Sequence, residues 1–311
     1  MKKILLLILL ATTWTGMYAQ LPELSPPYEV VGPYIPKEME FAGEKIVLKR
    51  ADLHERIDRE LITFTFSHTT TLLMLKRANR YFPTIERILK ENNVPDDLKY
   101  LMIIESSGDI EALSPVKAAR LWQFMSETGR EYGLEINRMV DERYHVEKST
   151  HAACKYLKES YEKYGDWLTA CASYNAGQRR ISEELEKQLT DKATDLWLNK
   201  ETSRYMFRLL AAKQIFEFPR MYGFVLHARD LYPPLPTTPL EIKQTIPDLA
   251  SFAKRKGISL LMLKTANPWL RGNSLPVVEK KSYILQIPVT EKWEYNPNET
   301  IPHSKRWVID N

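Results

Sequence analysis

Apolar residues recur at helical spacing through the first two thirds of the chain. Leu53, Ile57 and Leu61 repeat every four positions, and a second apolar stripe runs from Tyr81 to Leu89. Such stripes are typical of helices that bury one face. The pattern predicts an N-terminal helical extension over residues 49–93.

The next predicted helix places a carboxyl group on its apolar face. It follows Pro95, a residue favoured where helices begin, and Leu98, Leu101 and Met102 share one face with Glu105. A carboxyl group that loses water keeps its proton more readily, as a general acid requires. The alternative for Glu105, taken alone, is a glutamate at the edge of the core that pairs with a basic residue.

Two more helices are predicted further along the chain. One begins near Ser149 and ends at Gly165, and Asp166 caps the next, in which Leu168 and Asn175 share a face. We therefore expect an all-α domain over residues 94–217. The aromatic residues at helical spacing within it are expected to belong to the core, namely Trp122, Tyr132, Tyr144 and Trp167.

Prolines then separate a smaller unit of different pattern. Residues 218–239 are rich in proline and predict a linker. Residues 240–290 alternate in the order strand, helix, helix, strand, with Gly257 ending the first helix and Asn267-Pro268 the second. Residues 291–311 are expected to be a tail, in which His303, Lys305 and Arg306 form a solvated basic cluster.

The N-terminus has the pattern of an export signal. Lys2 and Lys3 precede a short apolar run, and Ala19 is suited to cleavage, so residues 1–19 are expected to be a signal peptide. Residues 20–48 then form an extended lead-in. The apolar run is too short for a membrane span of about twenty residues. No cysteine occurs before Cys154. We expect an exported, periplasmic protein that is not a lipoprotein and has no transmembrane segment in its mature form.

The net charge and the cysteine and histidine content bear on which ligands the protein is expected to bind. Removing Lys2 and Lys3 lowers the formal charge from +4 to +2, which does not indicate a nucleic-acid-binding protein. Cys154 and Cys171 either form a disulfide or are core thiols. The histidines are scattered and no C-x-x-C pair occurs, so no metal and no cofactor are expected.

Four ordered motifs resemble a known family. They are Ile103-Ile104-Glu105-Ser106-Ser107-Gly108, Ser114-Pro115, Leu121-Trp122-Gln123-Phe124-Met125 and Ser173-Tyr174-Asn175-Ala176-Gly177. Together they resemble the catalytic domain of lytic murein transglycosylases of the membrane-bound D type, within the SLT and goose-type lysozyme superfamily. The smaller unit is similar to a LysM peptidoglycan-binding repeat, with Gln244-Thr245-Ile246-Pro247 where the usual Gly-Asp-Thr stands. The resemblance implies a mainly α protein with a lysozyme-like all-α catalytic domain followed by a small βααβ LysM-like module.

The resemblance also implies a set of site residues. Glu105 is then the single general acid/base, and the substrate-binding residues are Ser106, Ser114, Gln123, Met125, Tyr174 and Asn175. Hydroxyls and amides suit the polar groups of a neutral glycan, while aromatic and thioether faces suit its apolar side. Asp109 is expected to be a loop or capping residue rather than a second catalytic carboxylate.

The implied activity is cleavage of the β-1,4 bond between N-acetylmuramic acid and N-acetylglucosamine, leaving 1,6-anhydromuramic acid. The implied partners are peptidoglycan glycan strands, and the LysM-like module would tether the enzyme to them. Two alternatives remain open, a lysozyme-like hydrolytic muramidase and a catalytically impaired peptidoglycan-binding scaffold. The latter is raised by Lys117 and Arg120, which stand where the family usually has glycines.

Overall fold

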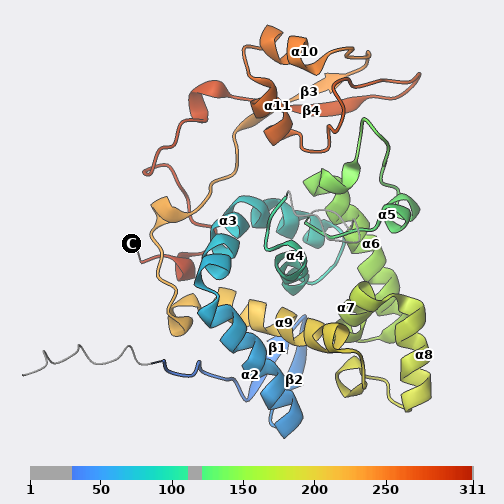
Figure 1. The fold of residues 1–311 in the computed structure, drawn as a ribbon, viewed down its shortest axis with the longest axis vertical. Helices are drawn as coiled ribbons and strands as arrows, with labels where there is room; N and C mark the ends of the chain where they lie inside the picture. The colour runs from blue at the N-terminus through green and yellow to red at the C-terminus, as the bar shows by residue number, and fades with distance from the viewer. Residues whose placement is uncertain (1–29, 111–120, 310–311) are drawn as a thin grey trace, which may run out of the picture. The chain divides into compact units, whose positions relative to one another are not determined.

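The computed structural model describes residues 30–110 and 121–309. From Pro33 onward they form one unit (Figure 1). Its helices are α2 (Ala51–Phe66), α3 (His68–Glu91), α4 (Lys99–Ser106), α5 (Ser126–Glu131), α6 (Val146–Tyr164), α7 (Trp167–Ala176), α8 (Gln178–Gln188), α9 (Lys200–Glu217), α10 (Leu249–Arg255) and α11 (Leu260–Ala266). Two antiparallel strand pairs complete it, the hairpin of β1 (Glu38–Phe41) with β2 (Glu44–Val47) and the pair of β3 (Thr237–Ile242) with β4 (Tyr283–Pro288), between which α10 and α11 lie in the chain.

Helices α2, α3, α4, α6, α7, α8 and α9 share one hydrophobic core, and α4 lies inside it. All but one of the residues of α4 are buried, the exception being Glu105. Helices α2 and α3 contribute to the same core, for example through Ile57 and Phe82, neither of which is exposed. The helices predicted over residues 49–93 therefore share the hydrophobic core of the domain that follows them.

The end of α4 needs a sharp change of chain direction. Ser107 adopts a left-handed conformation with φ of 56°, and Gly108 follows with φ of 66°. A Cβ atom at Gly108 would lie 3.1 Å from Cβ of Arg77 on α3. Glycine is favoured here because it tolerates both the positive φ and the close approach.

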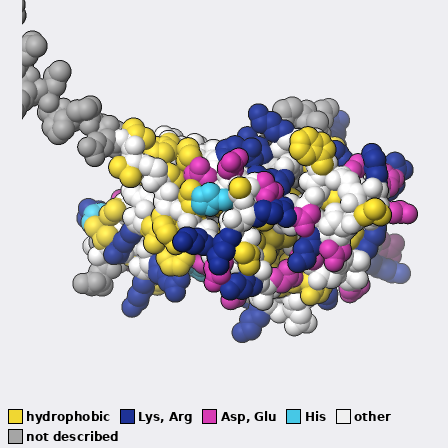
Figure 2. Space-filling view, turned by 90° about the horizontal axis from the view of Figure 1, so that it is seen from below, with side chains coloured by type: hydrophobic (Ala, Val, Ile, Leu, Met, Phe, Trp, Pro, Cys, Tyr) yellow, Lys and Arg dark blue, Asp and Glu magenta, His cyan; other side chains and the backbone are white. Residues whose placement is uncertain are grey.

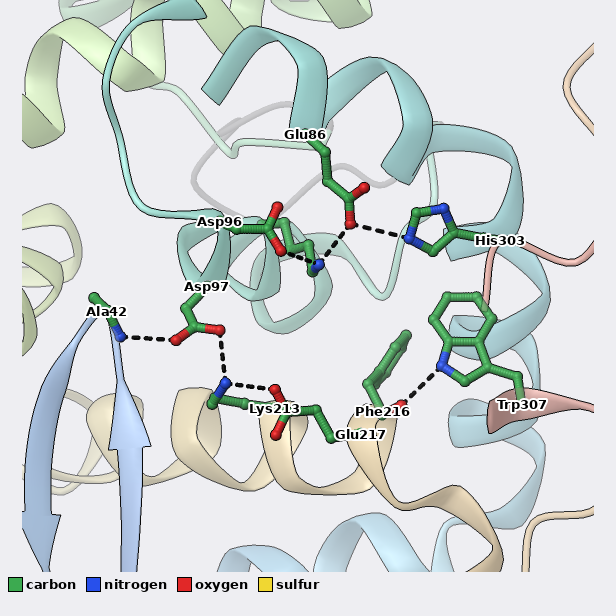
Figure 3. A network of polar contacts seen from close by, with 10 residues as sticks. Ala42, Glu86, Asp96, Asp97, Lys213, Phe216, Glu217, His303 and Trp307 are labelled. Atoms are coloured by element: carbon green, nitrogen blue, oxygen red, sulfur yellow. Dashed lines mark hydrogen bonds and ion pairs between the residues drawn. The ribbon is translucent and has the colours of Figure 1, made fainter. Parts of the chain in front are cut away.

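The extended lead-in predicted for residues 20–48 is wrong over its last part. Residues 38–47 form the β1–β2 hairpin, which turns through Ala42 and Gly43, both at positive φ. Phe41 and Leu48 are buried in the main core. The Ala42 N–H donates to Asp97, which also accepts from Lys213 (Figure 3). The hairpin is thereby fixed to the turn that precedes α4, and this turn is itself bound to α9.

The C-terminal tail, in which the sequence predicted a solvated basic cluster, packs partly into the main core. Trp307 is 3% exposed, and its indole N–H donates to the carbonyl oxygen of Phe216 in α9 (Figure 3). His303 makes a 2.9 Å hydrogen bond to Glu86 in α3, and Glu86 also accepts from Lys99. Of the three residues in the predicted basic cluster, Lys305 and Arg306 are exposed as expected and His303 is partly buried. Burial of Trp307 holds this part of the tail against the core, because a large aromatic side chain stabilises the fold when it is buried.

The small βααβ unit is confirmed, although its first strand begins at Thr237 rather than at residue 240. Asp248 caps α10 and Ser259 caps α11. The buried amide of Asn267 donates to Gln286 O and accepts from Gln286 N, so it joins the end of α11 to β4. Leu249, Leu263 and Leu285 form its centre and are not exposed.

Other sequence predictions can be compared with the same structure. Trp122, Tyr144 and Trp167 are buried as expected, whereas Tyr132 is only partly buried and donates to Glu159. Cys154 and Cys171 are buried free thiols, so the disulfide alternative is not adopted. Among the described residues, no helix has both the length and the apolar character needed to cross a bilayer.

Candidate active site

Glu105 ends the buried stripe of α4 and is partly exposed there, while Leu101 and Met102 one turn earlier are fully buried. The carboxyl group therefore lies where the core meets the surface. The sequence predicted this position from helical periodicity alone.

Residues of helix α9 form hydrogen bonds to Glu105 and to the backbone beside it. The Tyr205 hydroxyl donates a 2.5 Å hydrogen bond to Glu105 Oε1. One turn later, Arg208 donates to the carbonyl oxygen of Ile104, at 3.1 Å. These two contacts fix both the side chain and the backbone at the end of α4.

The surroundings raise the pKa of Glu105 to about 7. Burial is the largest cause, because it disfavours the charged carboxylate. The Tyr205 hydrogen bond and the positive charge of Arg208 act in the opposite direction, and the negative charge of Glu201 raises the pKa further. Near neutral pH both protonation states are populated, so one group can give up a proton and take one back.

The segment predicted to line a cleft lies beside α7. The indole N–H of Trp122 donates to Thr150 in α6, at 2.9 Å, and this fixes the segment in the core. Gln123 follows at φ of 49° and is partly exposed. Met125 precedes α5 and is 45% exposed, which is unusual for a methionine. Both side chains are therefore accessible to a ligand.

Tyr174 and Asn175 lie in the last turn of α7, which Asp166 caps at its start. The Tyr174 hydroxyl donates to the carbonyl oxygen of Trp122, at 2.7 Å, and so joins the two predicted motifs. Burial raises the pKa of Tyr174, and the charge of Glu105 raises it further. Tyr174 and Glu105 therefore share one local environment.

Ser106 is placed differently from the prediction. It is 4% exposed and its hydroxyl donates to the carbonyl oxygen of Met102, within its own helix. In this conformation it supports the end of α4 rather than facing a ligand. Ser114, Lys117 and Arg120 lie outside the described residues.

Asp109 is a loop residue, as predicted. It follows the end of α4 and forms a 2.8 Å ion pair with Arg77 in α3. This pair holds the loop after α4. Across residues 30–110 and 121–309, no group of three or more histidine, cysteine, aspartate and glutamate side chains is arranged to hold a metal ion.

Sequence reasoning missed Tyr205, the residue in direct contact with Glu105. Tyr205 is buried and shares its face of α9 with Leu209, which is typical of a core aromatic residue. Periodicity cannot reveal that a buried hydroxyl meets a carboxyl group 100 residues away.

The described side chains on the molecular face shown in Figure 2 form no continuous basic patch of the kind that binds polyanions. On the face in Figure 2, Lys and Arg side chains alternate with Asp and Glu side chains. A surface of mixed charge does not favour binding of nucleic acid.

Comparison with known proteins places this geometry in context. Residues 82–197 match the family described as "Transglycosylase SLT domain", and residues 238–291 match "Soluble lytic transglycosylase C-terminal LysM-like domain". Membrane-bound lytic murein transglycosylase D of Escherichia coli K12 is 33% identical over 228 residues, which are 72% of this chain and 49% of the relative. This chain thus spans about half the length of that relative.

Two further similarities are more limited. A putative tributyltin chloride resistance protein of Alteromonas sp. (strain M-1) is 27% identical over 135 residues, covering 43% of this chain and 65% of that protein. A solved structure of an inactive mutant of lytic transglycosylase Slt from Pseudomonas aeruginosa is 21% identical, with a TM-score of 0.35. It covers 43% of this chain and 23% of that one.

Proposed function

Because this chain belongs to the lytic transglycosylase family, with an SLT domain followed by a LysM-like C-terminal domain, we propose that it cleaves the β-1,4 bond between N-acetylmuramic acid and N-acetylglucosamine in peptidoglycan. The product is 1,6-anhydromuramic acid. The observation that carries the proposal is a carboxyl group at the edge of the core, hydrogen-bonded to Tyr205 and with a pKa of about 7.

In the first step, protonated Glu105 donates its proton to the oxygen of the glycosidic bond, and the bond to C1 of the muramyl residue breaks. Burial keeps the proton on Glu105 near neutral pH. The Tyr205 hydrogen bond then stabilises the carboxylate that remains, since hydrogen bonds to a charged group are stronger than those between neutral groups.

In the second step, the muramyl C6 hydroxyl attacks C1 of the same residue, and the Glu105 carboxylate takes its proton. Attack within one molecule is favoured by orientation and requires no activated water. Glycosidases that use water or a covalent intermediate need two carboxyl groups flanking the bond. Asp109, the nearest acidic residue along the chain, is paired with Arg77. One carboxyl group serving both steps is consistent with this arrangement.

The glycan is bound by the groups around Glu105. Gln123 and Asn175 offer amides to the N-acetyl groups, while Met125 and the Tyr174 ring contact the apolar face of a sugar. Ser106 is assigned a supporting role at the end of α4, because its hydroxyl is turned to Met102.

The substrate lies outside the cytoplasm, so the proposal includes export through residues 1–19, to the periplasm. The matched Escherichia coli relative is described as membrane-bound and as acting on murein. The glycan strands of peptidoglycan are the proposed partners, and the proposed reaction uses no cofactor.

The experiment that tests the proposal compares Glu105→Gln with Asp109→Asn on purified sacculi. Both replace a carboxyl group with an amide of similar shape. We expect Glu105→Gln to reduce release of soluble muropeptides by at least about 10²–10⁴-fold, the usual contribution of general acid catalysis. Asp109→Asn should retain most of the activity. Near-normal release by Glu105→Gln would remove this residue from the mechanism.

A further inference from the structure

The LysM-like module is joined to the catalytic domain over residues 135–145. Val140 forms a β-bridge with Leu270, and the Asp141 N–H donates to Trp269 O, at 2.9 Å. Glu135 accepts hydrogen bonds from Lys281 and Tyr283, at 2.7 and 3.0 Å. The module is thus held by backbone and side-chain bonds, and does not hang on a flexible linker.

The two domains also share apolar contacts there. Val140 and Tyr144 of the catalytic domain belong to the hydrophobic core of the module. The guanidinium group of Arg271 lies 4.2 Å from the centre of the Tyr144 ring. His145 stacks on Trp269 with 5.9 Å between ring centres. Both sides of the junction are therefore fixed relative to each other.

A cleft of about 290 Å³ opens at this junction, and we call it the junction cleft. Both domains line it, and the lining residues used below are Tyr81, Ile110, His145, Thr265, Trp269 and Gln286. Ile110 is five residues after Glu105, so their Cα atoms are at most about 18 Å apart. The junction cleft therefore lies near the carboxyl group that performs the proposed chemistry.

The lining combines aromatic faces with uncharged hydrogen-bonding groups. Tyr81 supplies a partly exposed ring and Thr265 an exposed hydroxyl, while the buried Trp269, which stacks on His145 and Tyr283, forms the wall behind them. The Gln286 side-chain oxygen accepts from Thr237, at 3.0 Å, which leaves the amide N–H groups to donate to a ligand. Apolar rings with a few amides and hydroxyls are typical of sites for neutral sugars.

The charged groups at the junction cleft are already paired. Arg80 donates to the carbonyl oxygen of Pro233 and lies over the Tyr232 ring. Glu147 forms an ion pair with Arg87, at 2.8 Å. Burial lowers the pKa of His145 to about 4, so its ring is neutral at neutral pH. Little net charge therefore faces the ligand.

We propose that the junction cleft is a second saccharide-binding site, which holds an N-acetylated sugar segment of the glycan strand while another part of the strand lies at Glu105. This inference rests on the proposed function and adds to it a site between the two domains. The module then acts as a fixed part of the substrate-binding surface and sets a preference for long glycans.

The test uses full-length Glu105→Gln protein, so that no ligand is consumed, and the tetrasaccharide of N-acetylglucosamine as the probe. Thr265→Trp fills the junction cleft, and Gln286→Ala removes its amide. Leu261→Trp is the matched control, because Leu261 is 76% exposed on the same helix and does not line the cleft. By isothermal titration calorimetry we expect Thr265→Trp to weaken binding about tenfold and Gln286→Ala about threefold, with no change in the control.

A second readout separates this inference from the proposed function. In the otherwise unmodified protein, Thr265→Trp should raise KM for long glycan strands and leave kcat unchanged. Binding that depends on Thr265 without any glycan cleavage would support the site and contradict the proposed function. Unchanged binding in Thr265→Trp, an equal loss in Leu261→Trp, or binding only of ligands that carry a peptide would overturn the saccharide site.

Discussion

The Tyr205 hydroxyl donates a 2.5 Å hydrogen bond to Glu105 Oε1, across the contact between α9 and α4. The bond opposes the effect of burial on the same carboxyl group. In the proposed mechanism, burial favours the protonated acid that breaks the glycosidic bond, and Tyr205 favours the carboxylate formed when the proton leaves. The two effects together keep the pKa of Glu105 near neutral.

Tyr205→Phe should change the pH dependence of cleavage as well as its rate. Loss of the hydrogen bond removes an influence that lowers the pKa of Glu105, so the alkaline limb of the activity profile should move up by about half to one pH unit. The rate at the optimum should fall about tenfold, because the carboxylate loses its donor.

The matched control is Tyr222→Phe. Tyr222 is also buried, but its hydroxyl donates to the carbonyl oxygen of Tyr34, away from Glu105. A purely structural role of Tyr205 would lower the rate without moving the pH profile, and that result would contradict the account. The measurement is turbidity loss of sacculi between pH 4 and pH 9.

Glu105 should reduce the stability of the folded protein at higher pH. Its pKa is about 7 in the folded state and about 4.5 when unfolded. Below pH 4.5 both states hold the proton and their stabilities are unaffected by ionisation. Between pH 4.5 and 7 the unfolded state ionises first, so the free energy of unfolding decreases as pH rises.

Glu105→Gln does not ionise and should avoid this loss. Its Oε1 atom can still accept the Tyr205 hydrogen bond. The variant should match the wild type at pH 4 and exceed it by about 1–3 kcal/mol at pH 8, measured by urea unfolding. Glu55→Gln on exposed α2 surface is the control for a general change in charge. A less stable Glu105→Gln protein at pH 8 would contradict the burial argument.

The C-terminal tail should contribute strongly to the stability of the catalytic domain. Trp307→Ala removes a buried indole that contacts Phe82 and Phe216, and should lower the free energy of unfolding by about 3–5 kcal/mol. Trp197→Ala is the matched control, because Trp197 is 90% exposed and the change should stay within about 0.5 kcal/mol. Equal stability of the two variants would show that the tail does not belong to the core.

Helical periodicity placed Glu105 on the buried stripe of α4 and Asn175 on one face of the helix that Asp166 caps. The roles proposed for Tyr174 and Asn175 came from the family resemblance and not from periodicity. The βααβ order of the module was also evident, because Gly257 and Asn267 end its helices at the predicted places.

Contacts between distant segments could not be predicted in this way. Tyr205 reaches Glu105 across 100 residues, and Trp307 reaches Phe216 across 91. The hydrophobic periodicity of a segment indicates that a side chain is buried, but it does not indicate which distant residue that side chain contacts. The β1–β2 hairpin was missed because each strand has only four residues, too few to show a clear alternation.

Mass spectrometry of muropeptides released from purified sacculi tests the central claim most directly. If the C6 hydroxyl attacks within the substrate and Glu105 serves both steps, the products should end in 1,6-anhydromuramic acid. They should be lighter by one water molecule than hydrolysis products. Products ending mainly in reducing muramic acid would contradict this account and support a hydrolytic muramidase, and no release would support a binding scaffold.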